Sequence, residues 1–238
     1  MAARKVVPDQ PKQAKTEHYR DHRQRMRRKL EDHGGRVLHD YEILEMLLYQ
    51  VNRRGDTKPP AKALLEKFGS LRAVFAASVS ALEAVEGIGR ETALFLTLLD
   101  AALCQDAWQK MREKPVLTSW QAVTDYCREE IGYKPIEYFI VLYLNARNRV
   151  IDHRQPDSGT VSRVSVYPRE IVRESILLNA SAVILVHNHP SGELTPSRDD
   201  IAMTDRIATA LASIDVQLHD HLIVNADHHV SFKYLGLL

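Results

Sequence analysis

The apolar run Ser181–His189, SAVILVHNH, constrains the fold of this chain more than any other feature. Its β-branched and aliphatic residues predict a buried strand that ends in two histidines two positions apart, followed by a proline. We expect similar strands at 138–145, 161–167 and 216–224, and helices at 168–179 and 197–211. Because strands and helices alternate, the second half is expected to be an α/β or α+β domain with helices packed on a sheet.

The first half of the chain shows helical periodicity throughout. Asp40–Gln50 places its apolar residues on one face of a helix, and Pro59-Pro60 can open another helix that ends at Gly69. Further helices are expected near 70–75, at 80–83 and after Gly89. The expected organisation is a disordered tail over 1–17, a helical domain over 18–105, a linker over 106–117 and the sheet-containing domain over 118–238.

Charge is unevenly distributed along the 238 residues. Residues 1–36 contain 11 basic and 5 acidic side chains, whereas 37–136 and 137–238 have net charges of −2 and −3. The basic segment 18–30 indicates either a solvated helix face or a surface that contacts phosphates. Nucleic acid is therefore a candidate partner of the N-terminal helical half.

Cysteine content and hydropathy exclude several classes of protein. Cys104 and Cys127 are too few for a disulfide framework or a four-thiolate zinc site. No apolar stretch approaches the roughly 18 residues that span a bilayer. We therefore expect a cytoplasmic protein with no membrane partner.

The turn Gly87-Ile88-Gly89 lies between two expected helices. Glycines there let the backbone approach a ligand and expose the amides of the next helix, which form an anion site. The string EAVEGIGRETALFL resembles a helix-hairpin-helix motif, which makes Gly87, Gly89 and Arg90 candidates for weak nucleic-acid binding. An ordinary interhelical turn is the alternative, and the net −2 of this region argues against strong binding.

The histidines at the end of the 181–189 strand are candidate metal ligands. Strand alternation puts His187 and His189 on one side, and the following loop can bring Asp200 back to them at a helix start. Two imidazoles and one carboxylate form the ligand set of an open catalytic zinc site. Ser197 and Asp200 also match a helix capping box, a role compatible with metal binding.

The spacing His187-x-His189, seven residues, Ser197, two residues, Asp200 resembles the JAMM signature of JAB/MPN metalloproteases. The longer string VHNHPSGELTPSRDD, together with VYPREIV, DHLIV, DYEILEMLLYQ and GIGRETA, is similar to the RadC family. This resemblance implies a JAB-type α/β/α domain, related to the deaminase-like fold, after a helix-hairpin-helix domain. It also implies one Zn²⁺ per chain on His187, His189 and Asp200, an oxyanion-stabilising Ser197, and a peptide or isopeptide-like substrate.

The resemblance further implies an upstream glutamate that deprotonates water, expected shortly before the Gly-Thr pair at 159–160. Arg154 and Gln155 occupy the expected positions, so we expect the usual glutamate to be replaced. General-base catalysis contributes about 10²- to 10⁴-fold in rate. The acidic residues that could substitute are Asp157 first, then Asp152 and Glu170.

Two functions remain open. The first is a zinc-dependent metallo-hydrolase of the JAMM metallopeptidase type. The second is a catalytically impaired, metal-binding and DNA-associated protein that acts in DNA repair or mobile-element biology. The missing carboxylate near residue 159 favours the second reading for activity, whereas the three ligands and Ser197 favour the first.

Other histidine-containing motifs give weaker alternatives. The HNH letters are adjacent here rather than spread over a ββα unit, and a nucleobase deaminase would need a P-C-x-x-C motif, which this chain lacks. We expect the remaining histidines near the C-terminus to be structural or to support the ligands. They are His219, His221, His228 and His229.

Overall fold

The computed structural model describes residues 12–156 and 166–238, with side chains from residue 21 onward. The chain forms two compact units, Met1–Leu99 and Asp100–Leu238. None of the helices in the described ranges combines the length and apolar composition that a membrane span requires.

The first unit is helical, as its periodicity predicts. Five leucines with no solvent exposure form the centre of its core. They are Leu44, Leu48, Leu64, Leu82 and Leu96. The helices are α1 (Lys12–His33), α2 (Asp40–Val51), α3 (Lys58–Phe68), α4 (Leu71–Ala76), α5 (Val79–Glu83) and α6 (Arg90–Arg112), with a 3₁₀ turn at Gly35–Val37. Serine hydroxyls cap α4 and α5, because Ser70 accepts from the Ala73 amide and Ser78 from the Ala81 amide.

Helix α1 corrects the tail predicted over 1–17. It begins at Lys12, inside that range, and continues to His33 before Gly34 turns the chain at a φ of 73°. The segment KQAKTE consists mainly of good helix formers, so propensity extends the helix although few apolar residues are present. The part of the predicted tail before Lys12 lies outside the described residues.

The second unit contains a five-stranded sheet in the order β2-β1-β3-β4-β5. The strands are β1 (Phe139–Leu144), β2 (Val150–Arg154), β3 (Ala182–Asn188), β4 (Gln217–Val224) and β5 (His229–Ser231). Pairing is antiparallel except between β3 and β4, which are parallel. The sequence does not predict the edge strands β2 and β5, because they are short and polar. The strand expected over 161–167 lies largely outside the described residues.

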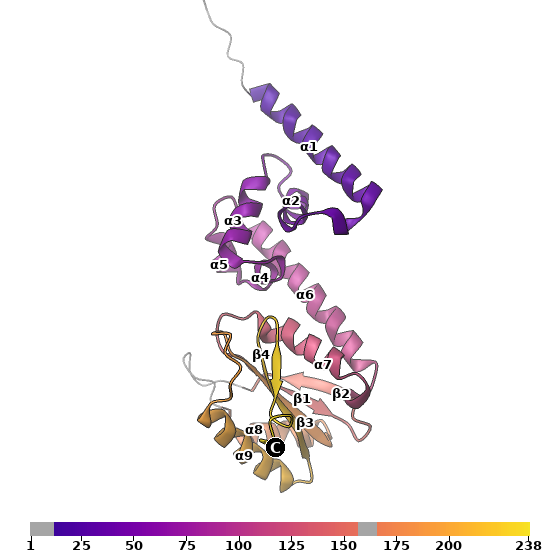
Figure 1. Ribbon diagram of the computed structural model, residues 1–238, viewed down its shortest axis with the longest axis vertical. Coiled ribbons are helices and arrows are strands. Elements are labelled where there is room, and N and C mark those ends of the chain that lie inside the picture. Colours follow the sequence, from indigo (N-terminus) through magenta and orange to yellow (C-terminus); the bar gives the residue numbers. More distant parts are fainter. Residues whose placement is uncertain (1–11, 157–165) are drawn as a thin grey trace, which may run out of the picture. The chain divides into compact units, whose positions relative to one another are not determined.

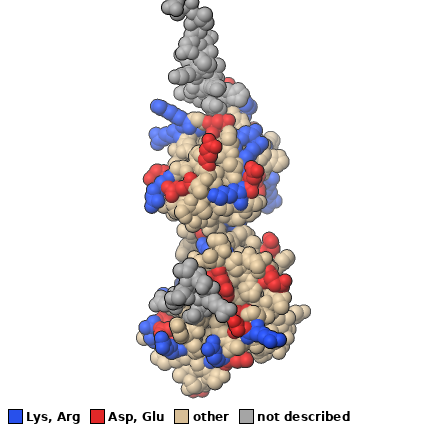
Figure 2. Space-filling model, turned by 90° about the vertical axis from the view of Figure 1, so that its left-hand side faces the viewer, with Lys and Arg blue, Asp and Glu red and all other residues tan. Residues whose placement is uncertain are grey.

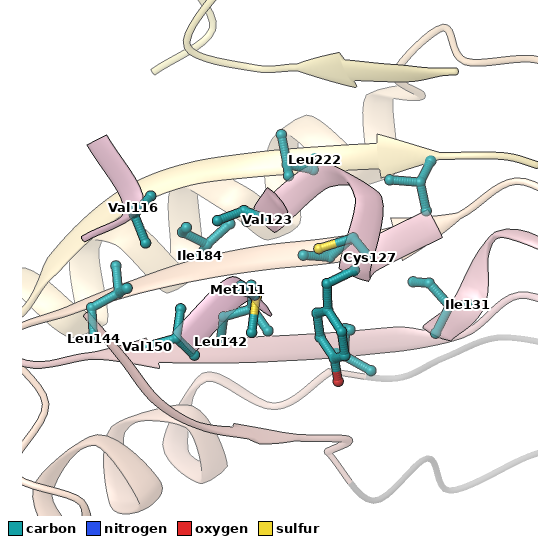
Figure 3. Packing of buried hydrophobic residues seen from close by; sticks show 14 of the residues in the cluster. Met111, Val116, Val123, Cys127, Ile131, Leu142, Leu144, Val150, Ile184 and Leu222 are labelled. Atoms are coloured by element: carbon teal, nitrogen blue, oxygen red, sulfur yellow. The ribbon is translucent and has the colours of Figure 1, made fainter. Parts of the chain in front are cut away.

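Helices cover both faces of this sheet. On one face, apolar residues of the central strands pack on α7 (Trp120–Cys127) and on the end of α6 (Figure 3). On the other face, Phe139, Val141 and Leu185 pack against α8 (Pro168–Leu177) and α9 (Arg198–Ala212) (Figure 1). A 3₁₀ turn at Val116–Thr118 and a π turn at Arg128–Gly132 flank α7. This layering confirms the expected fold class.

The segment expected to be a linker, 106–117, is largely helical. Helix α6 continues to Arg112, because Trp108 and the fully buried Met111 pack into the core of the second unit. The division between the units falls at residue 99, within α6. The polar composition of 106–113 reflects the exposed side of a helix.

Candidate metal centre

The two histidines of the motif meet at the end of β3. His187 is 1% exposed, and its Nε2 atom lies 2.9 Å from Nε2 of His189. Both side chains leave the strand on the face covered by α8 and α9, as strand alternation predicts. The face is set by the apolar residues at alternate positions of β3, which hold the strand in one register.

Asp200 reaches these histidines from the first turn of α9. Its Oδ1 lies 3.4 Å from Nε2 of His187, and its Oδ2 lies 3.8 Å from Nε2 of His189. Asp200 lies eleven positions after His189 in the chain, and the loop before α9 brings it back to the histidines, as the motif predicts. Two imidazole nitrogens and a carboxylate oxygen suit a transition-metal ion.

Ser197 is the N-cap of α9 and fixes Asp200. Its hydroxyl accepts from the Asp200 amide at 3.1 Å, while Oδ2 of Asp200 accepts from the Ser197 amide at 2.8 Å and from the Ser197 hydroxyl at 2.6 Å. The expected capping box is therefore present. These contacts occupy Oδ2, and Oδ1 is the oxygen that faces His187.

Glu137 is the residue that sequence reasoning missed. One of its carboxylate oxygens joins ligand atoms of His187, His189 and Asp200 in a group whose members all lie within 4.8 Å of one another. Glu137 precedes β1, which pairs antiparallel with β3 so that Phe139 faces His187. The only sequence signal was an acidic residue directly before an apolar strand run. Its relevance depends on which strand pairs with β3.

Asn188 holds the segment that carries Glu137. Its side chain lies on the opposite face of β3 from the histidines and is fully buried. Its Oδ1 accepts from the Tyr138 amide at 2.6 Å, and its Nδ2 donates to the backbone oxygens of Lys134 and Ile136 at 3.2 and 3.0 Å. The residue between the two histidines thus anchors both sides of Glu137.

The residues that occupy the positions expected for the glutamate lie outside the candidate metal centre. Arg154, at the end of β2, forms ion pairs with Asp152 at 2.7 Å and with Glu174 of α8 at 3.8 Å. Gln155 is exposed, and neither residue belongs to the metal-site group. Asp157 lies outside the described residues.

Glu170, the last of the acidic substitutes considered, is in the first turn of α8. Its carboxylate pairs with Arg169 and Arg173 on the same helix. Asp152, half-buried in β2, pairs with Arg154. In the described ranges, the carboxylate that joins the two histidines and Asp200 is therefore that of Glu137.

Hydrogen bonds to the far nitrogens orient both imidazoles. Nδ1 of His189 lies 2.6 Å from the backbone oxygen of Glu193, which can only accept, so Nδ1 carries a proton, and the neutral form of the ring has its lone pair at Nε2. Nδ1 of His187 lies 2.8 Å from Nε2 of His221. Burial lowers the pKa of His187, because a buried imidazolium loses hydration. Two ring nitrogens and a carboxylate oxygen this close together would attract a cation.

A cleft of about 570 Å³ opens beside this group. Its walls are formed by residues of β1, α8 and α9 and of the segments directly before them, and include Glu137, Phe139, Tyr167, Ser197, Met203 and Arg206. The candidate ligand Asp200 also faces this cleft. A substrate bound there would approach both carboxylates.

The glycine turn of the helical unit has the geometry that the sequence predicts. Gly87 has a φ of 82° in the turn between α5 and α6, and the neighbouring Ile88 is buried. A Cβ atom on Gly87 would lie 3.4 Å from Cβ of Pro60. Arg90 is exposed at the start of α6, 3.8 Å from the carboxylate of Glu83. Nucleic-acid binding by this turn stays a prediction.

Several basic side chains of α1 serve the fold. Arg23 donates to the backbone oxygens of Asn52, Arg53 and Gly55 at 2.9 to 3.0 Å, and Lys29 pairs with Glu42. On the face of the helical unit seen in Figure 2, Lys and Arg side chains are interspersed with Asp and Glu. Part of the positive charge of residues 1–36 is therefore hydrogen-bonded or paired with acidic residues within the helical unit.

Comparisons with known proteins agree on one family. Residues 117–237 match the model of the RadC-like JAB domain. A UPF0758 protein of Rhodobacter capsulatus is 44% identical over 205 residues, which cover 86% of this chain and 96% of the relative. The match spans the sheet, both histidines, Ser197 and Asp200. With half of its length matched by the family model, the chain belongs to the RadC-like JAB domain family.

Proposed function

We propose that the protein is a zinc-dependent hydrolase that cleaves a peptide or isopeptide-like amide. The observation that carries this proposal is the convergence of Glu137, His187, His189 and Asp200 from three separate parts of the chain. Three of these match the ligand set of an open catalytic zinc site, and the fourth has the chemistry of a general base.

The separations of the candidate donor atoms are close to those of a tetrahedral metal site. Tetrahedral ligands with metal bonds of about 2.0–2.2 Å have donor atoms about 3.3–3.6 Å apart. Nε2 of His187 lies 2.9 Å from Nε2 of His189, a little below that range, and 3.4 Å from Oδ1 of Asp200, within it. A zinc ion held there would polarise a carbonyl and lower the pKa of water.

The side chains around the cleft have complementary roles in amide hydrolysis. Glu137 accepts a proton from the attacking water as the water oxygen bonds to the carbonyl carbon. It then delivers this proton to the amide nitrogen as the C–N bond breaks. Ser197 donates to the developing oxyanion when its hydroxyl turns from Asp200 towards the cleft.

The proposal is tested by separating metal content from activity. Purified wild type should contain about one zinc per chain, and Asp200→Ala should lose it. Glu137→Gln should keep zinc but lose about 10²- to 10⁴-fold in hydrolysis of a quenched peptide library or isopeptide-linked substrates.

Glu170→Gln is the matched control, because Glu170 is an acidic residue of the same unit outside the group. It should retain both zinc and activity. Zinc-free wild-type protein after preparation in excess zinc would refute the proposal, as would full activity of Glu137→Gln.

The DNA-associated alternative depends on the helical unit. Arg25 and Arg28 of α1 are exposed. Contacts between these residues and DNA phosphates would make binding to duplex DNA weaken steeply between 50 and 200 mM salt. The double substitution Arg25→Glu and Arg28→Glu should weaken binding. A charge reversal at Lys29, which forms an ion pair within the helical unit, would instead disturb folding. Affinity that is insensitive to salt would contradict the phosphate contacts.

A further inference from the structure

A chain of hydrogen bonds leads from the metal centre into the core and back to it. Nδ1 of His187 lies 2.8 Å from Nε2 of His221 in β4, and Nδ1 of His221 lies 2.7 Å from Oγ1 of Thr204 in α9. The Thr204 hydroxyl also lies 2.6 Å from the backbone oxygen of Asp200. Two candidate ligands from different elements are thus joined through a third element.

The chain is closed to solvent. His187, His221 and Thr204 are 1%, 0% and 1% exposed, and the rings of Phe139 and Phe232 pack against His221 at 5.9 and 4.4 Å between centroids. Buried polar groups of this kind depend on one another for their hydrogen bonds, because a group left unpaired there has no water to bond to instead.

The direction of each hydrogen bond follows from the acceptor at the end of the chain. The backbone oxygen of Asp200 carries no proton, so the Thr204 hydroxyl donates to it and accepts from Nδ1–H of His221. Neutral His221 then has a lone pair at Nε2, which accepts from Nδ1–H of His187. This leaves the Nε2 lone pair of His187 facing His189 and Asp200.

We infer that His221 and Thr204 are positioning residues that hold His187 in the tautomer and orientation in which its Nε2 atom binds a metal ion. The inference rests on the proposed function and extends it beyond the ligands. Reversing the hydrogen bonds would place a proton on Nε2 of His187, directed at the position of the cation. Groups that orient ligating histidines contribute about 10- to 100-fold to metal affinity.

A purely structural role for Thr204 makes a different prediction. Threonine in a helix often donates to the backbone oxygen four residues earlier, and Thr209 of α9 does so to Asp205 at 2.9 Å. Thr209 is exposed and faces no histidine, so Thr209→Val removes the same helical contact without touching the chain of hydrogen bonds. It is therefore the matched control.

The test measures zinc affinity of metal-free full-length protein by competition with a chelating dye. Thr204→Val keeps the shape of the side chain and should bind zinc about 10- to 100-fold more weakly. Thr204→Ser keeps the hydroxyl and should remain close to wild type, as should Thr209→Val. Equal affinity of Thr204→Val and wild type overturns the inference alone, as does an equal loss in Thr204→Ser. A wild type that binds no zinc overturns the proposed function as well.

A second measurement covers the case in which Thr204→Val does not fold. Proton NMR of the zinc-loaded wild type should show slowly exchanging Nδ1–H signals for both His187 and His221. A proton on Nε2 of His221 would reverse the chain of hydrogen bonds and overturn the inference.

Discussion

Replacing the buried Asn188 by alanine removes three partly buried hydrogen bonds of the second unit. The amide side chain holds the backbone of Lys134, Ile136 and Tyr138, the segment that carries Glu137. Neither imidazole of the candidate metal centre is bonded to this side chain, whose partners are the backbone groups of Lys134, Ile136 and Tyr138. The substitution is therefore expected to displace the proposed base, Glu137, without removing a candidate ligand.

The expected loss of stability follows from these contacts. Each hydrogen bond contributes about 0.5–1.5 kcal/mol net, so three of them amount to about 3 kcal/mol of unfolding free energy. The substitution leaves the carbonyl oxygens of Lys134 and Ile136 and the amide of Tyr138 partly buried without these partners. We therefore expect the loss of unfolding free energy to lie towards the upper end of the range for three hydrogen bonds. A displacement of Glu137 by about 1 Å should also lower kcat by about 10²-fold.

Urea unfolding of metal-free protein measures the first quantity, and zinc content with kcat measures the second. Asn145→Ala is the control, because Asn145 accepts from the amides of Arg147 and Arg149 at the opposite end of β1. It should cost less stability and leave kcat unchanged. A zinc-loaded Asn188→Ala protein as active as Asn145→Ala would refute a positioning role for Asn188.

Three further predictions concern the same unit. His187→Ala should remove stoichiometric zinc, as read by elemental analysis; a full complement of zinc in this variant would exclude His187 as a ligand. Ser197→Ala should cost about 1 kcal/mol of unfolding free energy through loss of the α9 cap, and an unchanged urea midpoint would contradict this. Burial lowers the pKa of His219 and of His229 below the usual 6.5, so the unfolded chain binds protons that the folded chain does not. Stability of metal-free protein should be full above about pH 6.5 and fall as pH decreases towards the folded-state pKa values, which urea midpoints at pH 7 and pH 5 would check.

The candidate ligand set could be predicted from the sequence alone, since the interactions that bring these residues together are local. Strand alternation places His187 and His189 on one side, and a capping box starts α9 at Ser197 and holds Asp200. Hydrophobic periodicity likewise determined the helical first unit and the layered second unit. Where local signals were weak, the expectations differed from the structure, as at the start of α1 and in the polar part of α6.

The groups that reach this candidate site from distant parts of the chain depend on the tertiary fold. Glu137 is 50 residues before His187 in the chain and reaches it because β1 pairs antiparallel with β3. His221 is 34 residues after His187 and reaches it because β4 is the parallel neighbour on the other side. Strand order and register arise from packing of whole faces of the sheet against helices. Residue spacing along the chain therefore cannot reveal the candidate base or the residues proposed to orient the candidate ligands.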